Sequence, residues 1–322
     1  MTESAQDGIV YRKCCPSCGA VPFHLITREP FDRGALRDFF ESHYEGRANI
    51  AALQGYEYEI VRCASCKLAY QRTVPSGGLV NQIYEIWIPP AERERLHQLY
   101  TLLDYCYWAE QVQFVVQHFK LQPHALRILD FGMGWAEWVL MAKAFGCHVT
   151  GSELSTARLE HARSLGIETL DWEQLPSRKF HFINTEQVFE HLLEPLVVLK
   201  HLVQSMDEGG VLKISVPNCR AALRKLSRRR SFGSLSPKDR IPVVPLEHVN
   251  CFDYRSLVAL AQFAGLRPLR PRLRLIYNSS SGWLSPRRAL RLAVRPIYRH
   301  VFPKSTFVYF VKDERVRGTG RL

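Results

Sequence analysis

The sequence lacks any apolar run of about 18 residues or more, the length that a membrane-spanning helix needs. Residues 1–8 are polar and lack the apolar core of a signal peptide. Internal repeats and long low-complexity tracts are also missing, which excludes a repeat architecture. These absences predict a cytoplasmic globular protein without a transmembrane segment.

Acidic residues are in the minority, with 31 Asp and Glu against 43 Lys and Arg, and the net charge is +12. Such a balance favours anionic partners: nucleic acid, a nucleotide-linked substrate or a lipid surface. It also fits a solubilising surface that has no partner. With 322 residues, of which 46% are hydrophobic, the chain can bury the core of one large domain or two modest ones.

The nine cysteines do not resemble a secreted disulfide framework, because the chain is long and the count is odd. Four of them form two C-x2-C pairs, Cys15/Cys18 and Cys63/Cys66, with 44 residues between the pairs. Four thiolates hold a tetrahedral Zn²⁺, and a long insert costs little to close. We therefore expect a structural zinc site, closed to chemistry. The alternative is four buried or redox-active thiols without metal.

From residue 126 onward, short apolar runs alternate with helical patterns. We expect strands at 126–131, 147–151, 167–170, 180–184 and 211–216, and helices at 136–145, 155–165 and 190–206. A helix at 254–264 and strands within 266–276 and 306–311 follow. This alternation predicts an α/β fold in which helices cover both faces of a largely parallel sheet.

The first of these strands ends in a glycine-bearing turn, where Gly132 and Gly134 let the backbone approach a ligand closely. The next strand ends at Glu153, and a carboxylate there binds ribose hydroxyls. A dinucleotide-binding loop would need a small residue at Glu137, whose carboxylate would repel a pyrophosphate. A glycine turn that holds no cofactor is a further alternative.

The segment Asp130-Phe131-Gly132-Met133-Gly134, followed by Glu153, resembles motif I and the acidic second motif of class I S-adenosylmethionine (SAM)-dependent methyltransferases. The resemblance spans about residues 90–275 and includes, in order, Asp171-Trp172, Glu190-His191-Leu192-Leu193-Glu194-Pro195, the segment 209–218, and Glu247-His248. It implies a Rossmann-like seven-stranded sheet and SAM as the cofactor. The SAM contacts that it implies are Asp130, Gly132, Gly134, Glu153 and Asp171. Ala136 stands where many members have a third glycine.

Two histidines, His191 and His248, lie in the segments that match this family. A hydroxyl acceptor needs its proton removed during methyl transfer, and histidine is the natural base. Either ring could instead make structural hydrogen bonds. The quinone O-methyltransferases are similar near His191 and hold a divalent metal with carboxylates and histidine. Gln187 occupies the position of one of their acids, which argues against a catalytic metal here.

The N-terminal region is similar to bacterial methyltransferases that carry a zinc ribbon, since Tyr84 and Trp87 follow the second cysteine pair as they do there. Many of those proteins belong to sugar, glycan or natural-product pathways. We expect a zinc-ribbon-like segment at 9–78, a helical connector at 79–122, and a methyltransferase domain at 123–322. Within that domain, 220–250 is expected to form a lid or substrate loop, and 283–303 a basic helix insertion.

The sequence thus predicts a SAM-dependent methyltransferase that acts on a hydroxyl of a small molecule, sugar or glycan precursor. An RNA methyltransferase is one alternative, which the positive charge and the zinc ribbon permit. Against it, no RNA-binding module is recognisable, and Asn184-Thr185-Glu186-Gln187 replaces the Asn-Pro-Pro-aromatic motif of amino-group methylation. A second alternative is a non-catalytic protein that binds SAM. The basic residues of 286–299 fit contact with anionic lipid, a clamp for a phosphorylated substrate, or a solvated helix face.

Overall fold

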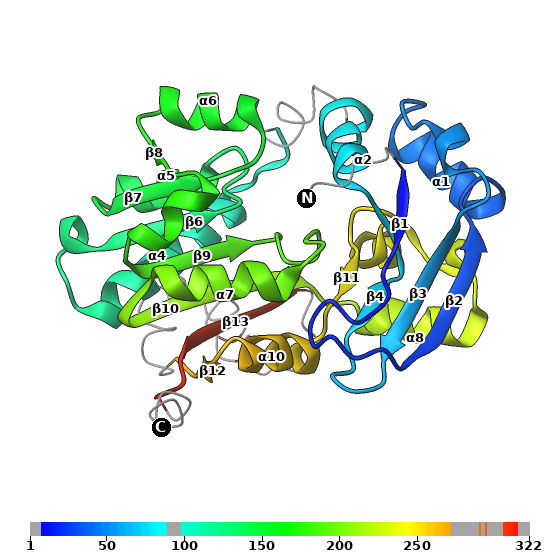
Figure 1. The fold of residues 1–322 in the computed structure, drawn as a ribbon. Coiled ribbons are helices and arrows are strands. Elements are labelled where there is room, and N and C mark those ends of the chain that lie inside the picture. Colours follow the sequence, from blue (N-terminus) through cyan, green and yellow to red (C-terminus); the bar gives the residue numbers. More distant parts are fainter. Residues whose placement is uncertain (1–7, 89–97, 272–289, 291–293, 295–304, 315–322) are drawn as a thin grey trace. The chain divides into compact units, whose positions relative to one another are not determined.

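The structure is a computed structural model that describes residues 8–88, 98–271, 290, 294 and 305–314 (Figure 1). The chain divides into two compact units. The first unit comprises residues 1–99, 190–196 and 217–260, and the second comprises 100–189, 197–216 and 261–322. None of the described helices has the length and apolar character of a membrane span.

The second unit is built on a seven-stranded sheet with the order β12-β13-β10-β9-β6-β7-β8 (Figure 1). Its strands are β6 (Arg127–Phe131), β7 (His148–Ser152), β8 (Glu168–Thr169), β9 (Phe180–Glu186), β10 (Met206–Pro217), β12 (Leu266–Leu269) and β13 (Ser305–Lys312). Strands β10, β9, β6, β7 and β8 pair in parallel, whereas β12 and β13 pair antiparallel. The α/β fold expected from the alternating apolar runs is confirmed, since the runs from 126 to 216 each coincide with a strand of this sheet.

Helix α4 (Leu102–Phe119) and the short helix η3 (Pro123–Ala125) precede β6. The strands that follow are connected by α5 (Glu137–Ala144), α6 (Thr156–Ser164), η4 (Trp172–Ser177) and α7 (Pro195–Ser205). Gly146 and Gly166 follow α5 and α6 with φ of 86° and 66°, a left-handed conformation that ends a helix at little cost. Apolar side chains of β6, α4 and α5 form one buried cluster that includes Val112, Ile128 and Val139.

Two expectations about helices are corrected. The helix expected at 190–206 begins only at Pro195, because proline lacks a backbone N–H and so favours the first helical turn. Residues 220–229, expected to be loop, form helix α8 (Arg220–Arg229), because Ala222, Leu223 and Leu226 lie on one face and are buried. The basic insertion expected at 283–303 lies almost entirely outside the described residues.

The first unit contains two small sheets. One has the order β11-β4-β3-β2 and the other pairs β1 with β5. These strands are β1 (Ile9–Tyr11), β2 (Phe23–Pro30), β3 (Glu57–Cys63), β4 (Ala69–Gln71), β5 (Thr73–Pro75) and β11 (Asn250–Cys251). The other elements are α1 (Gly34–His43), η1 (Ile50–Leu53), α2 (Gly77–Gln82), η2 (Ile83–Trp87), α8, η5 (Phe232–Ser234), α9 (Pro237–Arg240), η6 (Ile241–Val243) and most of α10 (Tyr254–Phe263).

The core of the first unit is aromatic and joins segments far apart in the chain. Phe40, Tyr58, Trp87 and Phe232 are buried in one cluster. The Phe232 ring packs edge-on against Tyr58 at a centroid distance of 5.8 Å. Residues 217–260 therefore complete a core that the N-terminal segment begins.

A half-buried arginine fixes two further segments of this unit. The Arg12 guanidinium donates to the backbone oxygens of Leu193 (2.7 Å), Leu192 (3.2 Å) and Val249 (3.1 Å). It also donates to Asn250 Oδ1 at 3.0 Å. Burial lowers the pKa of Arg12 to about 10, and the guanidinium therefore stays charged at neutral pH. The segments that carry His191 and His248 are held through this one side chain.

Candidate functional site

The turn after β6 has the backbone geometry that its glycines predict. Gly132 and Gly134 have φ of 69° and 56°, and the Gly132 N–H donates to Ser152 O at 2.8 Å. A Cβ on Gly132 would lie 2.5 Å from Val188 Cγ2, whereas the space beside Gly134 is open to 4 Å. Ala136 also has a positive φ of 74°, a conformation that explains why glycine suits this position.

Glu153 closes the turn from the end of β7. Its Oε2 accepts the Gly134 N–H at 2.9 Å, and its Oε1 accepts the Leu154 N–H at 2.8 Å and the Ser155 N–H at 3.3 Å. A carboxylate offers about four lone-pair sites, and these bonds leave acceptor capacity for ligand hydroxyls. The structure thus brings together Gly132, Gly134 and Glu153, three of the residues expected to contact SAM.

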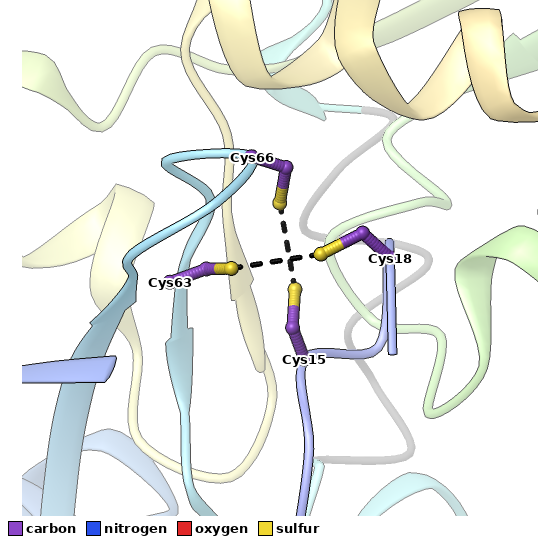
Figure 2. A group of neighbouring side chains, drawn as sticks. All are labelled: Cys15, Cys18, Cys63 and Cys66. Atoms are coloured by element: carbon purple, nitrogen blue, oxygen red, sulfur yellow. Dashed lines mark hydrogen bonds between the residues drawn. The ribbon is translucent and has the colours of Figure 1, made fainter. Parts of the chain in front are cut away.

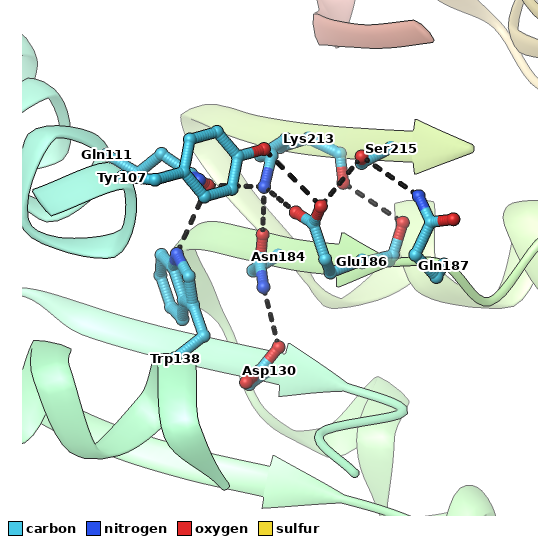
Figure 3. Close-up of polar contacts among 10 residues, drawn as sticks. Tyr107, Gln111, Asp130, Trp138, Asn184, Glu186, Gln187, Lys213 and Ser215 are labelled. Atoms are coloured by element: carbon cyan, nitrogen blue, oxygen red, sulfur yellow. Dashed lines mark hydrogen bonds and ion pairs between the residues drawn. The ribbon is translucent and has the colours of Figure 1, made fainter. Parts of the chain in front are cut away.

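Asp130 lies at the end of a buried polar chain that crosses the second unit (Figure 3). Its side chain is 2% exposed, and its Oδ1 accepts a hydrogen bond from Asn184 Nδ2 at 2.8 Å. Burial raises the pKa of Asp130 to about 7, although the Asn184 hydrogen bond and the Lys213 charge act in the opposite direction. This carboxyl therefore faces the protein interior.

The series of polar contacts that begins at Asp130 leads through Asn184 to Lys213 (Figure 3). Lys213 is fully buried. Lys213 Nζ donates to Asn184 Oδ1 at 3.0 Å and contacts Gln111 Oε1 and the Glu186 carboxylate. Glu186 also accepts hydrogen bonds from Ser215 Oγ at 2.9 Å and Tyr107 OH at 3.4 Å. A charged pair thus joins the end of β9 to the interior of β10. Sequence reasoning missed it because Lys213 lies within an apolar run.

Asp171 occupies a different environment from the other carboxylates. It is exposed and caps η4 through a reciprocal arrangement with Gln174, whose Oε1 accepts the Asp171 N–H at 3.0 Å. The neighbouring Trp172 ring stacks on His201 at a centroid distance of 3.8 Å. This carboxylate therefore has a structural role as a cap, and its exposure leaves it accessible to a ligand.

The four cysteines expected to bind zinc converge in the first unit (Figure 2). Cys15 Sγ lies 3.5 Å from Cys66 Sγ, and Cys18 Sγ lies 3.6 Å from Cys63 Sγ. All four sulfurs are within 4.8 Å of one another. A hydrogen bond from the Cys15 thiol lowers the pKa of Cys66 to about 5, which favours a thiolate. Sulfurs around tetrahedral zinc lie ~3.8 Å apart, and the donor set fits that ion.

The two predicted catalytic histidines also meet in the first unit. Their rings pack edge-on with centroids 4.7 Å apart. Tyr84 OH lies 2.9 Å from His191 Nδ1, and Glu247 O lies 3.1 Å from the same nitrogen. Burial, followed by proximity to His191, lowers the pKa of His248 to about 3. His248 is therefore neutral at physiological pH and a weak base.

Sequence reasoning did not assign roles to the residues around this pair. In the sequence, Tyr84 stands out only as part of the family resemblance, whereas in the structure the π-helical η2 brings its hydroxyl within 2.9 Å of His191 Nδ1. Glu247 accepts hydrogen bonds from Tyr44 OH at 2.7 Å and contacts His43 Nε2 at 3.1 Å. These partners come from distant segments, and no local pattern identifies them.

Comparison with known proteins supplies a family. A family model described as "Methyltransferase domain" matches residues 100–270. No match is found among curated proteins.

Several solved structures are similar to part of this chain. The plantazolicin methyltransferase BpumL in complex with SAH is 15% identical and aligns over 73% of this chain and 93% of its own, with a TM-score of 0.46. The [4+2]-cyclase SpnF is 17% identical over 63% of this chain and 81% of its own, with a TM-score of 0.39. DesVI of Streptomyces venezuelae is 26% identical and aligns over 39% of this chain and 56% of its own, with a TM-score of 0.32. Because the family model covers more than half of the sequence, the chain belongs to the methyltransferase-domain family.

Proposed function

We propose that this protein transfers a methyl group from SAM to a hydroxyl of a small molecule, sugar or glycan precursor. The observation that supports this most directly is the Gly134 N–H bonded to Glu153 at the carboxyl edge of β6 and β7. In an α/β sheet of this kind, ligands bind at the carboxyl ends of the strands. SAM supplies an electrophilic methyl group on a sulfonium, so the protein has mainly to bind and orient.

The residues of the turn fit such a nucleoside. Glu153 retains acceptor capacity for ribose hydroxyls, and open space beside Gly134 leaves room for a ligand against the backbone. Asp171, exposed on η4, is the proposed adenine contact. Asp130, which is buried, would act by holding the turn rather than by touching the nucleoside.

Calorimetry with SAM tests the cofactor. We expect wild-type protein to bind SAM and Glu153→Gln to bind it at least ~10-fold more weakly, because hydrogen bonds to a charged group contribute about 1.5–3 kcal/mol. Glu160→Gln removes the same charge from an exposed position on α6 and is the matched control. A folded wild-type protein that releases no heat with SAM or its demethylated product would refute the proposal.

We propose that His191 and His248 promote deprotonation of the acceptor hydroxyl. Their close packing and the hydroxyl of Tyr84 support a shared task. Replacement of either by alanine is expected to lower turnover ~10²-fold while SAM binding stays near wild type. Mass spectrometry of products formed from glycan, nucleotide-sugar and RNA pools would identify the acceptor. Full turnover in both variants would contradict a role for the pair.

We also propose that Cys15, Cys18, Cys63 and Cys66 hold one structural Zn²⁺. The expected consequence is that Cys63→Ser loses that ion and unfolds the first unit at lower temperature, because bound metal stabilises only the folded state. Cys14→Ser, which removes the exposed neighbouring thiol, should retain the ion. Elemental analysis and thermal unfolding measure both effects. A folded, active and metal-free wild type would count against this site.

A further inference from the structure

We infer that Arg158 binds the cofactor together with Glu153, by donating a hydrogen bond to the same ribose hydroxyl that donates to the Glu153 carboxylate. Arg158 is the third residue of α6, and its Nη1 lies 4.0 Å from Glu153 Oε2. Both side chains belong to the second unit. The inference rests on the proposed function, because it assigns a further contact to the same bound nucleoside.

The Glu153 carboxylate has one acceptor position left, on the oxygen that lies nearest Arg158. Its Oε1 accepts two backbone hydrogen bonds, from Leu154 N–H at 2.8 Å and from Ser155 N–H at 3.3 Å. Its Oε2 accepts one, from Gly134 N–H at 2.9 Å. Because each carboxylate oxygen has two lone pairs, a ligand hydroxyl that donates to Glu153 has to do so at Oε2.

The distance between the two side chains fits one hydroxyl group between them. At 4.0 Å, Arg158 Nη1 and Glu153 Oε2 are too far apart for a direct hydrogen bond. Two hydrogen bonds of ~2.8 Å that meet at ~90–110° on one oxygen span ~4.0–4.6 Å. A hydroxyl is both donor and acceptor, so it can donate to Oε2 and accept from Nη1. A phosphate on the ribose would be repelled by the Glu153 carboxylate, so the pair selects an unphosphorylated ribose.

The Arg158 guanidinium is oriented by the glycine-bearing turn without being hydrogen-bonded there. Its Cζ lies 5.6 Å from the centroid of the Trp135 ring, which is a cation–π contact with the turn itself. Trp135 also packs edge-on against His161 of α6, with centroids 5.7 Å apart. No hydrogen bond from Arg158 is found among the described residues, so its five N–H donors are available to a ligand. Because the side chain is oriented beforehand, a ligand has less to order on binding.

The position of Arg158 in its helix indicates binding rather than stability. It lies in the first turn of α6, where the helix dipole disfavours a cation, and that turn contains no acidic residue to offset it. The ion pair with Glu153 contributes little to folding, because its atoms are 4.0 Å apart and 24% of the Arg158 side chain is exposed. A bound hydroxyl is therefore the contact that accounts for an arginine at this position.

Calorimetry on the full-length protein tests the inference, with S-adenosylhomocysteine (SAH), the demethylated product, and its 2′-deoxy and 3′-deoxy analogues as ligands. Arg158→Met removes the guanidinium but keeps an unbranched side chain beside Trp135. It is expected to bind SAH ~10-fold more weakly than wild type, because a hydrogen bond from a charged group is lost. Arg163→Met, at an exposed position of the same helix, is the matched control and should bind SAH as wild type does. Thermal unfolding verifies that both variants are folded.

The deoxy analogues separate a direct contact from an indirect one. In wild type, removal of the shared hydroxyl breaks two hydrogen bonds, whereas in Arg158→Met only the bond to Glu153 is left to lose. The affinity penalty of one analogue should therefore be at least ~5-fold smaller in Arg158→Met than in wild type. Equal penalties for both analogues, or SAH binding by Arg158→Met that matches or exceeds that of wild type, would overturn the inference alone. A wild type that binds no SAH would overturn the proposed function and the inference with it.

Discussion

Replacement of the buried Lys213 by methionine is expected to destabilise the second unit substantially. Lys213 is 0% exposed and its Nζ has three oxygen partners, from Gln111, Asn184 and Glu186. Methionine fills most of the volume but provides no donor. The two amide oxygens then lose their ammonium partner, and the Glu186 carboxylate keeps only the hydroxyls that donate to it.

The magnitude follows from which charges remain buried. Removal of one member of a buried ion pair costs about 3–5 kcal/mol. The Glu186 side chain is 27% exposed, and partial hydration of its carboxylate places the expected loss near the lower bound, at about 3 kcal/mol. The double variant Lys213→Met/Glu186→Gln removes both charges. It should recover about 1–2 kcal/mol of that loss, a typical coupling for residues in contact.

Urea unfolding, followed by tryptophan fluorescence and circular dichroism, measures both losses. Lys225→Met is the control, since Lys225 pairs with Asp239 at the surface with 49% of its side chain exposed. Such a pair contributes about 0–1 kcal/mol. A Lys213→Met protein within 0.5 kcal/mol of wild type would refute the argument that this buried ammonium is needed by its partners.

Two further perturbations probe the turn and the buried carboxyl of Asp130. The pKa of Asp130 is raised from 3.8 to about 7 on folding, so its contribution to stability is full below pH 3.8 and is lost as pH rises through about 7; Asp130→Asn should remove that slope from a plot of melting temperature against pH. Gly132→Ala, with its Cβ 2.5 Å from Val188, should weaken SAM binding at least ~10-fold by calorimetry, whereas Gly209→Ala has the same φ of 69° in open space and should bind normally.

The sheet of the second unit was predictable because its information is local. Apolar runs such as 126–131 can be read directly from the sequence, and the glycines after β6 are needed for the positive φ found there. Charge patterns were less informative. The basic residues of α8 suggested a loop, although Leu223 and Leu226 give it an apolar face. The helix was expected from residue 190, and only the structure shows that it begins at Pro195.

The candidate site was predictable only in part. Sequence reasoning selected His191, His248 and the four cysteines, because their residue types suggest chemistry wherever they lie. It could not foresee that Tyr84 reaches His191 or that Arg12 holds the backbone at Leu193 and Val249. These contacts join positions 107 to 237 residues apart. They are set by the tertiary fold, which local periodicity does not encode.

Because β11 pairs with β4, the first unit cannot be formed by the N-terminal segment alone. Asn250 and Cys251 complete a sheet whose other strands all lie before residue 72. A truncation that removes the N-terminal 78 residues would leave β11 without its neighbour and α8 without the aromatic cluster that it packs into. A domain that can be moved to another protein is usually one contiguous stretch of chain. Here the N-terminal segment and residues 217–260 would have to be moved together. Translation must likewise be almost complete before the first unit can close, since its last strand emerges late from the ribosome.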